Sequence, residues 1–265
     1  MKYVLKKVRM MRIYDIATGE HKVTLNDLKT AQFTGSQETV YAEGTDGAKL
    51  AAFDIHKVAG FKATNGTIDD GYLAMQVGTE PVEVVSGNQI LIRKVLTTED
   101  GSKVVLPHAA SGTVGNEIGF IYAKDTDGMP GKSYAQASGA SATEFAYNPE
   151  NKEITLPTGV FKAKDEVIVD YYPTFNKYTM VENDSTKFAL TGRVIVDAWF
   201  TDSCNEVDVP MQLVMEKGKI SGEVDISFGD QVAVQNISVD AMSTVCDESK
   251  ILWRMFTYDE EEIVA

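Results

Sequence analysis

The clearest pattern in the chain is an alternation of apolar and polar residues toward its C-terminal end. Over residues 219–228, apolar side chains and Gly222 take every second position, with polar side chains between them. Residues 207–215 alternate in the same way, with Pro210 on the polar face. A period of two is typical of a strand with one buried face, and a proline inside it indicates an edge or a bulge. The intervening Glu216-Lys217-Gly218 predicts a hairpin turn.

The same pattern predicts strands along most of the chain, separated by short turns. Several turns carry glycine after aspartate, as at 46–47, 100–101 and 127–128, and glycine provides the positive φ that tight turns require. Many short strands at this spacing indicate a β-sandwich or a barrel. The other predicted strands are residues 2–14, 23–34, 50–64, 82–96, 118–123, 153–156, 166–172, 188–201 and 250–258.

Helical signals are few. Residues 69–78 begin with two aspartates and end with glycine, which is the arrangement expected at the two ends of a short helix. Residues 239–242 are a second candidate for a short helical turn. The predicted fold class is therefore mainly β, a β-sandwich or barrel with one or two short helices.

The middle of the chain differs in composition from its two ends. Residues 131–142 are rich in Gly, Ser and Ala, which predicts a long exposed loop. Short predicted strands lie on both sides of this loop. We therefore expect a core built from residues 1–96 and 175–265, with residues 97–174 forming a β-rich insertion or an elaborated loop region.

The charge of the chain limits its partners. Among 265 residues, 39 are acidic and 25 basic, giving a formal net charge of −14. Such a surface repels nucleic acid, which argues against a protein that grips DNA but not against one that lets DNA pass. The first twelve residues, however, hold five basic residues and no acid, so the remainder carries −19. This start is either a solvated basic strand or an edge that meets an acidic surface, such as residues 259–262, on a neighbouring subunit.

Targeting signals are not expected, because the basic start runs into polar sequence and no run of eighteen apolar residues could cross a bilayer. The two cysteines, Cys204 and Cys246, are not in a CxxC arrangement, which favours free thiols in a reducing compartment such as the cytoplasm.

Candidate catalytic and metal-binding chemistry is weak. The three histidines, His21, His56 and His108, are scattered, whereas a metal site needs ligands that converge on one point. Residues 125–128 resemble the start of a calcium loop, but Gln136 stands where the twelfth-position glutamate is required, so a turn is predicted. The glycines of 112–119 lack the lysine and the helix of a phosphate loop. We therefore predict no enzyme activity, no cofactor, and no catalytic or metal-binding residue.

Three stretches, taken in order, resemble the major tail tube proteins of bacteriophages that infect Gram-positive hosts. The resemblance lies mainly before residue 96 and after residue 178, and the middle segment matches poorly. Its features are a strand with a basic start, a lysine on an otherwise apolar strand (Lys57), a short Leu-Ala helix and a late pair of strands around a proline. The stretches are residues 14–20 with 25–29 and 39–44, residues 53–68 with 73–79, and residues 190–200 with 209–213, 222–228 and 239–242.

The resemblance implies a virion protein of the phage tail, assembled in the host cytoplasm. Such subunits form β-sandwiches that join strands into hexameric rings, and stacked rings make a hollow tube for the genome. Implied partners are further copies, other tail proteins and DNA as non-specific cargo in an acidic lumen, with no membrane. Residues 50–64 and the loop region 27–44 would carry contacts between subunits or rings. The candidate interface residues are Lys6, Lys7, Arg9, Arg12, Lys57, Asp259 and Glu260.

Two alternative functions stay open at this point. One is another virion component, such as a capsid decoration, a connector or a sheath-associated protein. The other is a carbohydrate-binding β-sandwich that uses Tyr171, Tyr172 or Trp199 as a stacking platform, although core or interface packing is the commoner use of such aromatic residues.

Overall fold

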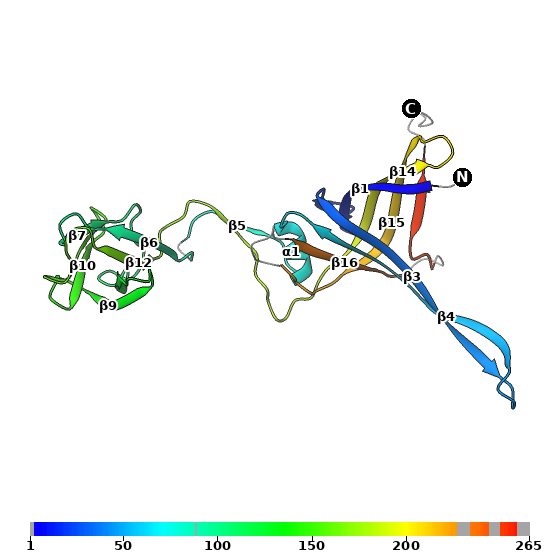
Figure 1. Ribbon diagram of the computed structural model, residues 1–265, viewed down its shortest axis with the longest axis horizontal. Helices are drawn as coiled ribbons and strands as arrows, with labels where there is room; N and C mark the ends of the chain where they lie inside the picture. The colour runs from blue at the N-terminus through cyan, green and yellow to red at the C-terminus, as the bar shows by residue number, and fades with distance from the viewer. Residues whose placement is uncertain (1–2, 88, 227–233, 244–249, 259–265) are drawn as a thin grey trace. The chain divides into compact units, whose positions relative to one another are not determined.

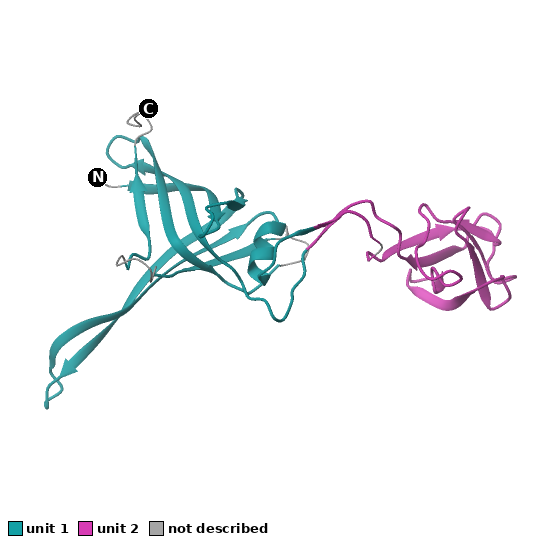
Figure 2. Ribbon diagram, turned by 180° about the vertical axis from the view of Figure 1, so that it is seen from behind, with its two compact units in different colours: residues 1–82, 181–265 teal, residues 83–180 magenta. Residues whose placement is uncertain are grey.

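The computed structural model describes residues 3–87, 89–226, 234–243 and 250–258. The chain forms two compact units, shown in Figure 2: unit 1 comprises Met1–Val82 and Val181–Ala265, and unit 2 comprises Glu83–Met180. Strands dominate both units, which confirms the predicted mainly-β class. The bounds of unit 2 differ from the predicted 97 and 174 because β6 (Ile92–Thr97) pairs with β12 (Glu166–Tyr171) inside unit 2.

Unit 1 is built on one curved sheet with the order β2-β1-β14-β15-β16-β4-β3, and β17 pairs with β15 (Figure 1). The strands β2 and β3 stand at opposite ends of this order, yet only Asn26 and Asp27 separate them in the sequence. The sheet must therefore curl until its two ends meet, which makes it barrel-like. The strands are β1 (Tyr3–Tyr14), β2 (His21–Leu25), β3 (Leu28–Glu43), β4 (Lys49–Asn65), β14 (Thr191–Asp202), β15 (Asp208–Ile220), β16 (Gln235–Ala241) and β17 (Arg254–Thr257).

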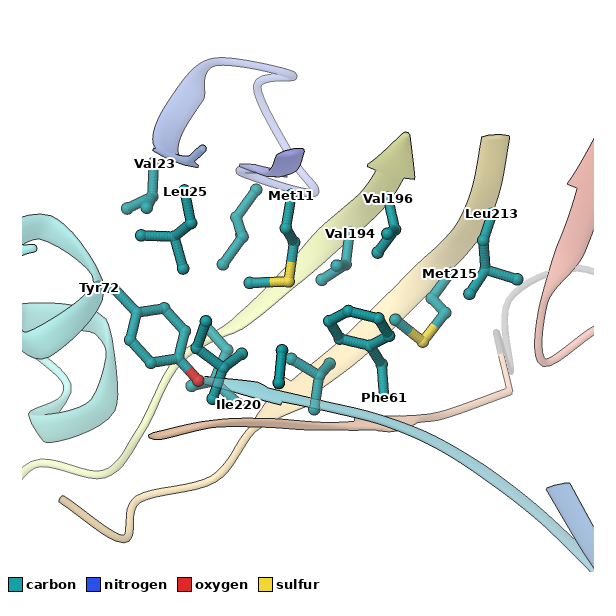
Figure 3. Close-up of a cluster of buried hydrophobic side chains, with 14 of the residues drawn as sticks. Met11, Val23, Leu25, Phe61, Tyr72, Val194, Val196, Leu213, Met215 and Ile220 are labelled. Carbon is teal, nitrogen blue, oxygen red and sulfur yellow. The ribbon is translucent and has the colours of Figure 1, made fainter. Parts of the chain in front are cut away.

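The core of unit 1 lies inside the curl and is closed by the helix α1 (Asp70–Val77). Figure 3 shows Tyr72 of α1 pointing toward Phe61 and Ile220, with Met11 and Met215 nearby. The side-chain oxygen of Asp69 accepts a hydrogen bond from the backbone N–H of Tyr72 at 2.8 Å and caps the helix. Burial raises the pKa of the Tyr72 hydroxyl to about 12.

Unit 2 has its own sheet, with the order β6-β12-β8-β9-β10-β11-β7. Its end strands β6 and β7 are joined by residues 98–102 alone, so this sheet also curls around its core. Ile121, Phe145, Ile154 and Val167 are fully buried in that core. A separate pair is formed by β5 (Val82–Val84) and β13 (Tyr178–Met180). The remaining strands of unit 2 are β7 (Lys103–Val105), β8 (Phe120–Lys124), β9 (Pro130–Ala137), β10 (Glu144–Asn148) and β11 (Glu153–Thr155).

The predicted turn at Glu216-Lys217-Gly218 is wrong, because β15 runs through these residues to Ile220. They form a bulge: between Gly192 and Val194 the register shifts, and β15 holds one residue more than β14. Gly218 is needed for close packing rather than for a turn, since a Cβ there would lie 2.7 Å from Val239 Cγ1. The alternating segment 219–228 leaves β15 after Ile220 and meets the sheet again where Ile226 bridges Gln235 of β16. Residues 227 and 228 lie outside the described part.

Two further local predictions are wrong for the same reason, which is that pairing with neighbouring strands overrides local composition. The predicted loop at 131–142 contains most of β9, which pairs with β8 and β10 and buries Tyr134 in the core of unit 2. The candidate helical turn at 239–242 begins within β16, where Val239 pairs with Phe61 and is buried.

Candidate assembly surfaces

A long hairpin of β3 and β4 occupies the segment that was expected to be a loop region, residues 27–44. Near its base it belongs to the curved sheet, because Gly60–Asn65 also pairs with β16. Beyond Ser36 and Val58 the two strands pair, among the described residues, with each other alone, and they extend away from the rest of unit 1 (Figure 1). We call residues 38–55 the distal hairpin.

The distal hairpin has one apolar and one polar face. Val40 pairs with Phe53, and Ala42 pairs with Ala51, so these four side chains lie on one side of the ladder. On the other side, Thr39 Oγ1 donates a hydrogen bond to Asp54 Oδ1 at 2.7 Å. The Lys49 ammonium also lies on the polar side, 3.8 Å from the centre of the Tyr41 ring.

The apolar face of the distal hairpin is uncovered. Phe53 is 58% exposed and Val40 is 44% exposed. An isolated two-stranded hairpin is at best marginally stable in water, and a grouped apolar surface marks a site of protein contact. This face was not predicted from the sequence, although apolar residues at the even positions 40 and 42 of β3 were a signal for it.

Among the described residues, two strands of unit 1 have an edge without backbone pairing, β1 from Val4 to Met10 and β17 along the edge away from β15. The strand β1 pairs with β14 along its length, but β2 covers only Met11–Tyr14 of its other edge. The strand β17 pairs with β15 and, among the described residues, with nothing else. Val4, Leu5, Met255 and Phe256 are exposed along these edges. Open edges of this kind are templates for pairing with another chain.

The structure places several of the predicted interface residues against the chain's own acids. Lys6 forms an ion pair with Asp208, and Arg12 lies 2.5 Å from Asp197 Oδ2. The Arg9 guanidinium lies over the Trp199 ring, 5.5 Å from its centre. Lys7 is exposed, and Asp259 and Glu260 lie outside the described residues. Some of the charge pairing that was expected between neighbouring chains is therefore present within a single chain.

The two ion pairs of β1 differ in burial. Arg12 and Asp197 are 29% and 14% exposed at their side chains, and Gln212 Nε2 donates a second hydrogen bond to Asp197 at 2.9 Å. Burial alone would lower the pKa of Arg12, but Asp197 outweighs it and the pKa is raised, so the guanidinium stays charged. Lys6 is 57% exposed, so solvent screens its pair with Asp208.

We expect Arg12→Ala to lower the free energy of unfolding of unit 1 by about 1–3 kcal/mol, because it leaves Asp197 half-buried without its cation. Lys6→Ala is expected to cost less than about 1 kcal/mol. Both tryptophans of the chain, Trp199 and Trp253, belong to unit 1, so urea unfolding followed by tryptophan fluorescence reports on this unit. Equal effects of the two substitutions would contradict this assignment.

Lys57 lies at the base of the distal hairpin, beside the segment that leads into β17. With Lys250 and Trp253 it lines an opening of about 500 Å³, and the other lining residues are Ser243, Ile251 and Leu252. The Trp253 ring packs edge-to-face on Phe33 of β3, with 5.1 Å between ring centres. The described residues that line the opening are therefore basic and apolar.

Two of the three histidines lie within hydrogen-bonding distance of a neighbouring polar side chain. His56 Nδ1 lies 2.9 Å from Glu38 Oε2, and His21 Nε2 lies 2.6 Å from Thr24 Oγ1. In the part of the chain that the structure describes, no three His, Cys, Asp or Glu side chains gather as they would around a metal ion. None of the described helices has the length and apolar character to cross a membrane.

The aromatic residues proposed as a sugar-stacking platform differ in burial and in the unit to which they belong. Tyr171 is 1% exposed and belongs to the core of unit 2. Trp199 belongs to unit 1 and has Arg9 over its ring. Tyr172 alone of the three is well exposed. The use of Tyr171 as a stacking platform is therefore ruled out by its burial.

The sequence model of one family, described as the YomU/Tube protein family, matches residues 3–252. A search of the curated proteins found no match. The family match spans nearly the whole chain and indicates a phage tube-like structural protein, not a type known for catalysis. The chain belongs to the YomU/Tube protein family.

Proposed function

We propose that this chain is the subunit of a phage tail tube, in which copies join into hexameric rings and stacked rings form a hollow conduit for the genome. The observation that carries this proposal is the pair of edges on β1 and β17 that the described residues leave open, which bound the same four adjacent strands, β1-β14-β15-β17. Each strand of this group is antiparallel to the next.

Ring closure follows from the direction of these four strands. Because the group has an even number of antiparallel strands, β17 runs antiparallel to β1. A rotation about a ring axis that lies along the strands preserves strand direction, so β17 of one copy meets β1 of the next as an antiparallel neighbour. The contact is heterologous and closes on itself in a ring, which leaves neither edge open.

The distal hairpin supports the stacking of such rings. It extends beyond the curved sheet and carries an apolar face that the described residues of its own chain leave exposed. A neighbouring ring would cover that face and remove the exposed apolar area from water, which favours association. Unit 2 contributes no strand to the sheet of unit 1, so we place it outside the ring-forming contacts.

The charge distribution supports passage of DNA without adhesion. Residues 83–180 hold 12 acidic and 9 basic residues, a net charge of −3. The rest of the chain, which forms unit 1, holds 27 acidic and 16 basic residues, so it carries −11 of the total −14. A conduit built from unit 1 would repel the phosphate backbone on average. DNA is then cargo rather than a bound partner, and other tail proteins are expected at the two ends of the tube.

Sedimentation of the purified chain over a range of concentrations tests this proposal. We expect a species with the mass of a closed ring and, at higher concentration, long assemblies that sediment much faster. The proposal would be contradicted if the chain stayed monomeric at every concentration, even when purified phage tail tips are added as seeds.

A further inference from the structure

A bulge at the base of the distal hairpin determines on which side of the hairpin its apolar residues lie. Along β4, apolar residues take the odd-numbered positions from 51 to 63, with Lys57 as the exception. Read as a regular strand, this pattern would put all of them on one face. The pairing shows otherwise: Ser36 pairs with Val58, but Glu38 pairs with Ile55, so β4 carries one extra residue there.

The extra residue reverses the face of the strand. Below the bulge, Phe61 and Ala63 point into the core of unit 1 and are buried. Above it, Ala51, Phe53 and Ile55 lie on the opposite side of the ladder, because one inserted residue moves every later side chain to the other face. His56, inside the bulge, has φ of 49°, which is rare for a residue other than glycine. The core of the same chain therefore cannot cover the distal apolar face.

The distal hairpin is acidic as well as apolar. Residues 38–55 contain four acids, Glu38, Glu43, Asp46 and Asp54, and one base, Lys49. The described residues that line the opening at the base of the hairpin have the complementary character, because Lys57 and Lys250 lie beside Ile251, Leu252 and Trp253. The distal hairpin and the described lining of the opening therefore match in both charge and polarity.

We propose that the tip of the distal hairpin of a second copy occupies this opening. Phe53 of the incoming hairpin packs against Ile251 and Trp253, while Glu43 and Asp46 lie near the two lysines. The tip lies at one end of the hairpin and the opening at the other, so the contact joins two different surfaces and is heterologous. Each copy can therefore bind the next one, and the same contact repeats from copy to copy. The inference rests on the proposed tube function and names the partner surface that joins one ring to the next.

Charge reversal tests this pairing. A tip variant carries Glu43→Lys and Asp46→Lys, an opening variant carries Lys57→Glu and Lys250→Glu, and a combined variant carries all four. We expect the tip and opening variants each to lower the yield of tubes at least about tenfold, since like charges then face each other, and the combined variant to restore it. Lys187→Glu, at an exposed lysine elsewhere in unit 1, is the matched control.

Pelleting and electron microscopy give the yield, and circular dichroism confirms that each variant folds. If the combined variant is as defective as the two parents while the wild-type chain makes tubes, this inference is overturned and the tube function stands. If the wild-type chain makes no tube, the proposed function fails, and the inference with it. Rings that persist without stacking in the tip and opening variants would support the pairing.

Discussion

Gly78→Ala is expected to lower the free energy of unfolding of unit 1 by about 2–4 kcal/mol. Gly78 ends α1 with φ of 78°, a left-handed conformation that alanine adopts at a cost. A Cβ at this position would also lie 2.7 Å from the carbonyl carbon of Phe188 and 2.8 Å from its nitrogen. Because both atoms are backbone, the helix end and the chain entering β14 would have to move apart.

Gly19→Ala is the matched control for this prediction. Gly19 has φ of 72°, but nothing lies within 4 Å of the position of its Cβ. It should therefore show the cost of the backbone conformation alone, about 1 kcal/mol. Urea unfolding followed by tryptophan fluorescence measures both variants. Equal losses at Gly19 and Gly78 would show that the contact between Gly78 and Phe188 does not constrain the fold.

Phe53→Asp is expected to reduce tube assembly at least about a hundredfold without changing the stability of unit 1. Phe53 stands on the apolar face of the distal hairpin and is 58% exposed in the single chain, so its replacement removes little packing there. In an assembly that covers this face, the new carboxylate would be buried without a partner, which costs several kcal/mol. The fraction of protein that pellets as tubes, at a fixed concentration, is the measurement.

Ala52→Asp is the control for Phe53→Asp, because it puts the same charge one residue away on the polar face, opposite Tyr41. It should leave assembly nearly unchanged. An equal loss in both variants would mean that total charge, and not the apolar face, governs assembly. Normal assembly of Phe53→Asp would mean that this face stays in water.

The sequence was sufficient for the fold class and for most strands of unit 1, because alternation with a period of two survives in β1, β14 and β15 wherever one face is buried. Alternation does not reveal bulges. The extra residue at 216–218 looked like a turn, and the one at 56–57 left no mark on the odd-numbered apolar pattern of β4. In both places the pairing partner, distant in sequence, determines the geometry.

The candidate surfaces were only partly predictable for a related reason. The basic residues of β1 were visible in the sequence, but their partners Asp197 and Asp208 are brought to them by the sheet order. The apolar face of the distal hairpin required the register of β3 against β4. Lys57 was singled out from a family resemblance, and the structure adds the Lys250 and Trp253 side chains that line the same opening.

Electron cryomicroscopy of the assembled chain tests the central claim most directly. The account predicts a hollow tube of stacked sixfold rings, with β17 of each copy paired to β1 of its neighbour and the distal hairpin reaching the next ring. A solid fibre, a closed shell, or a tube in which β1 and β17 remain unpaired would contradict it.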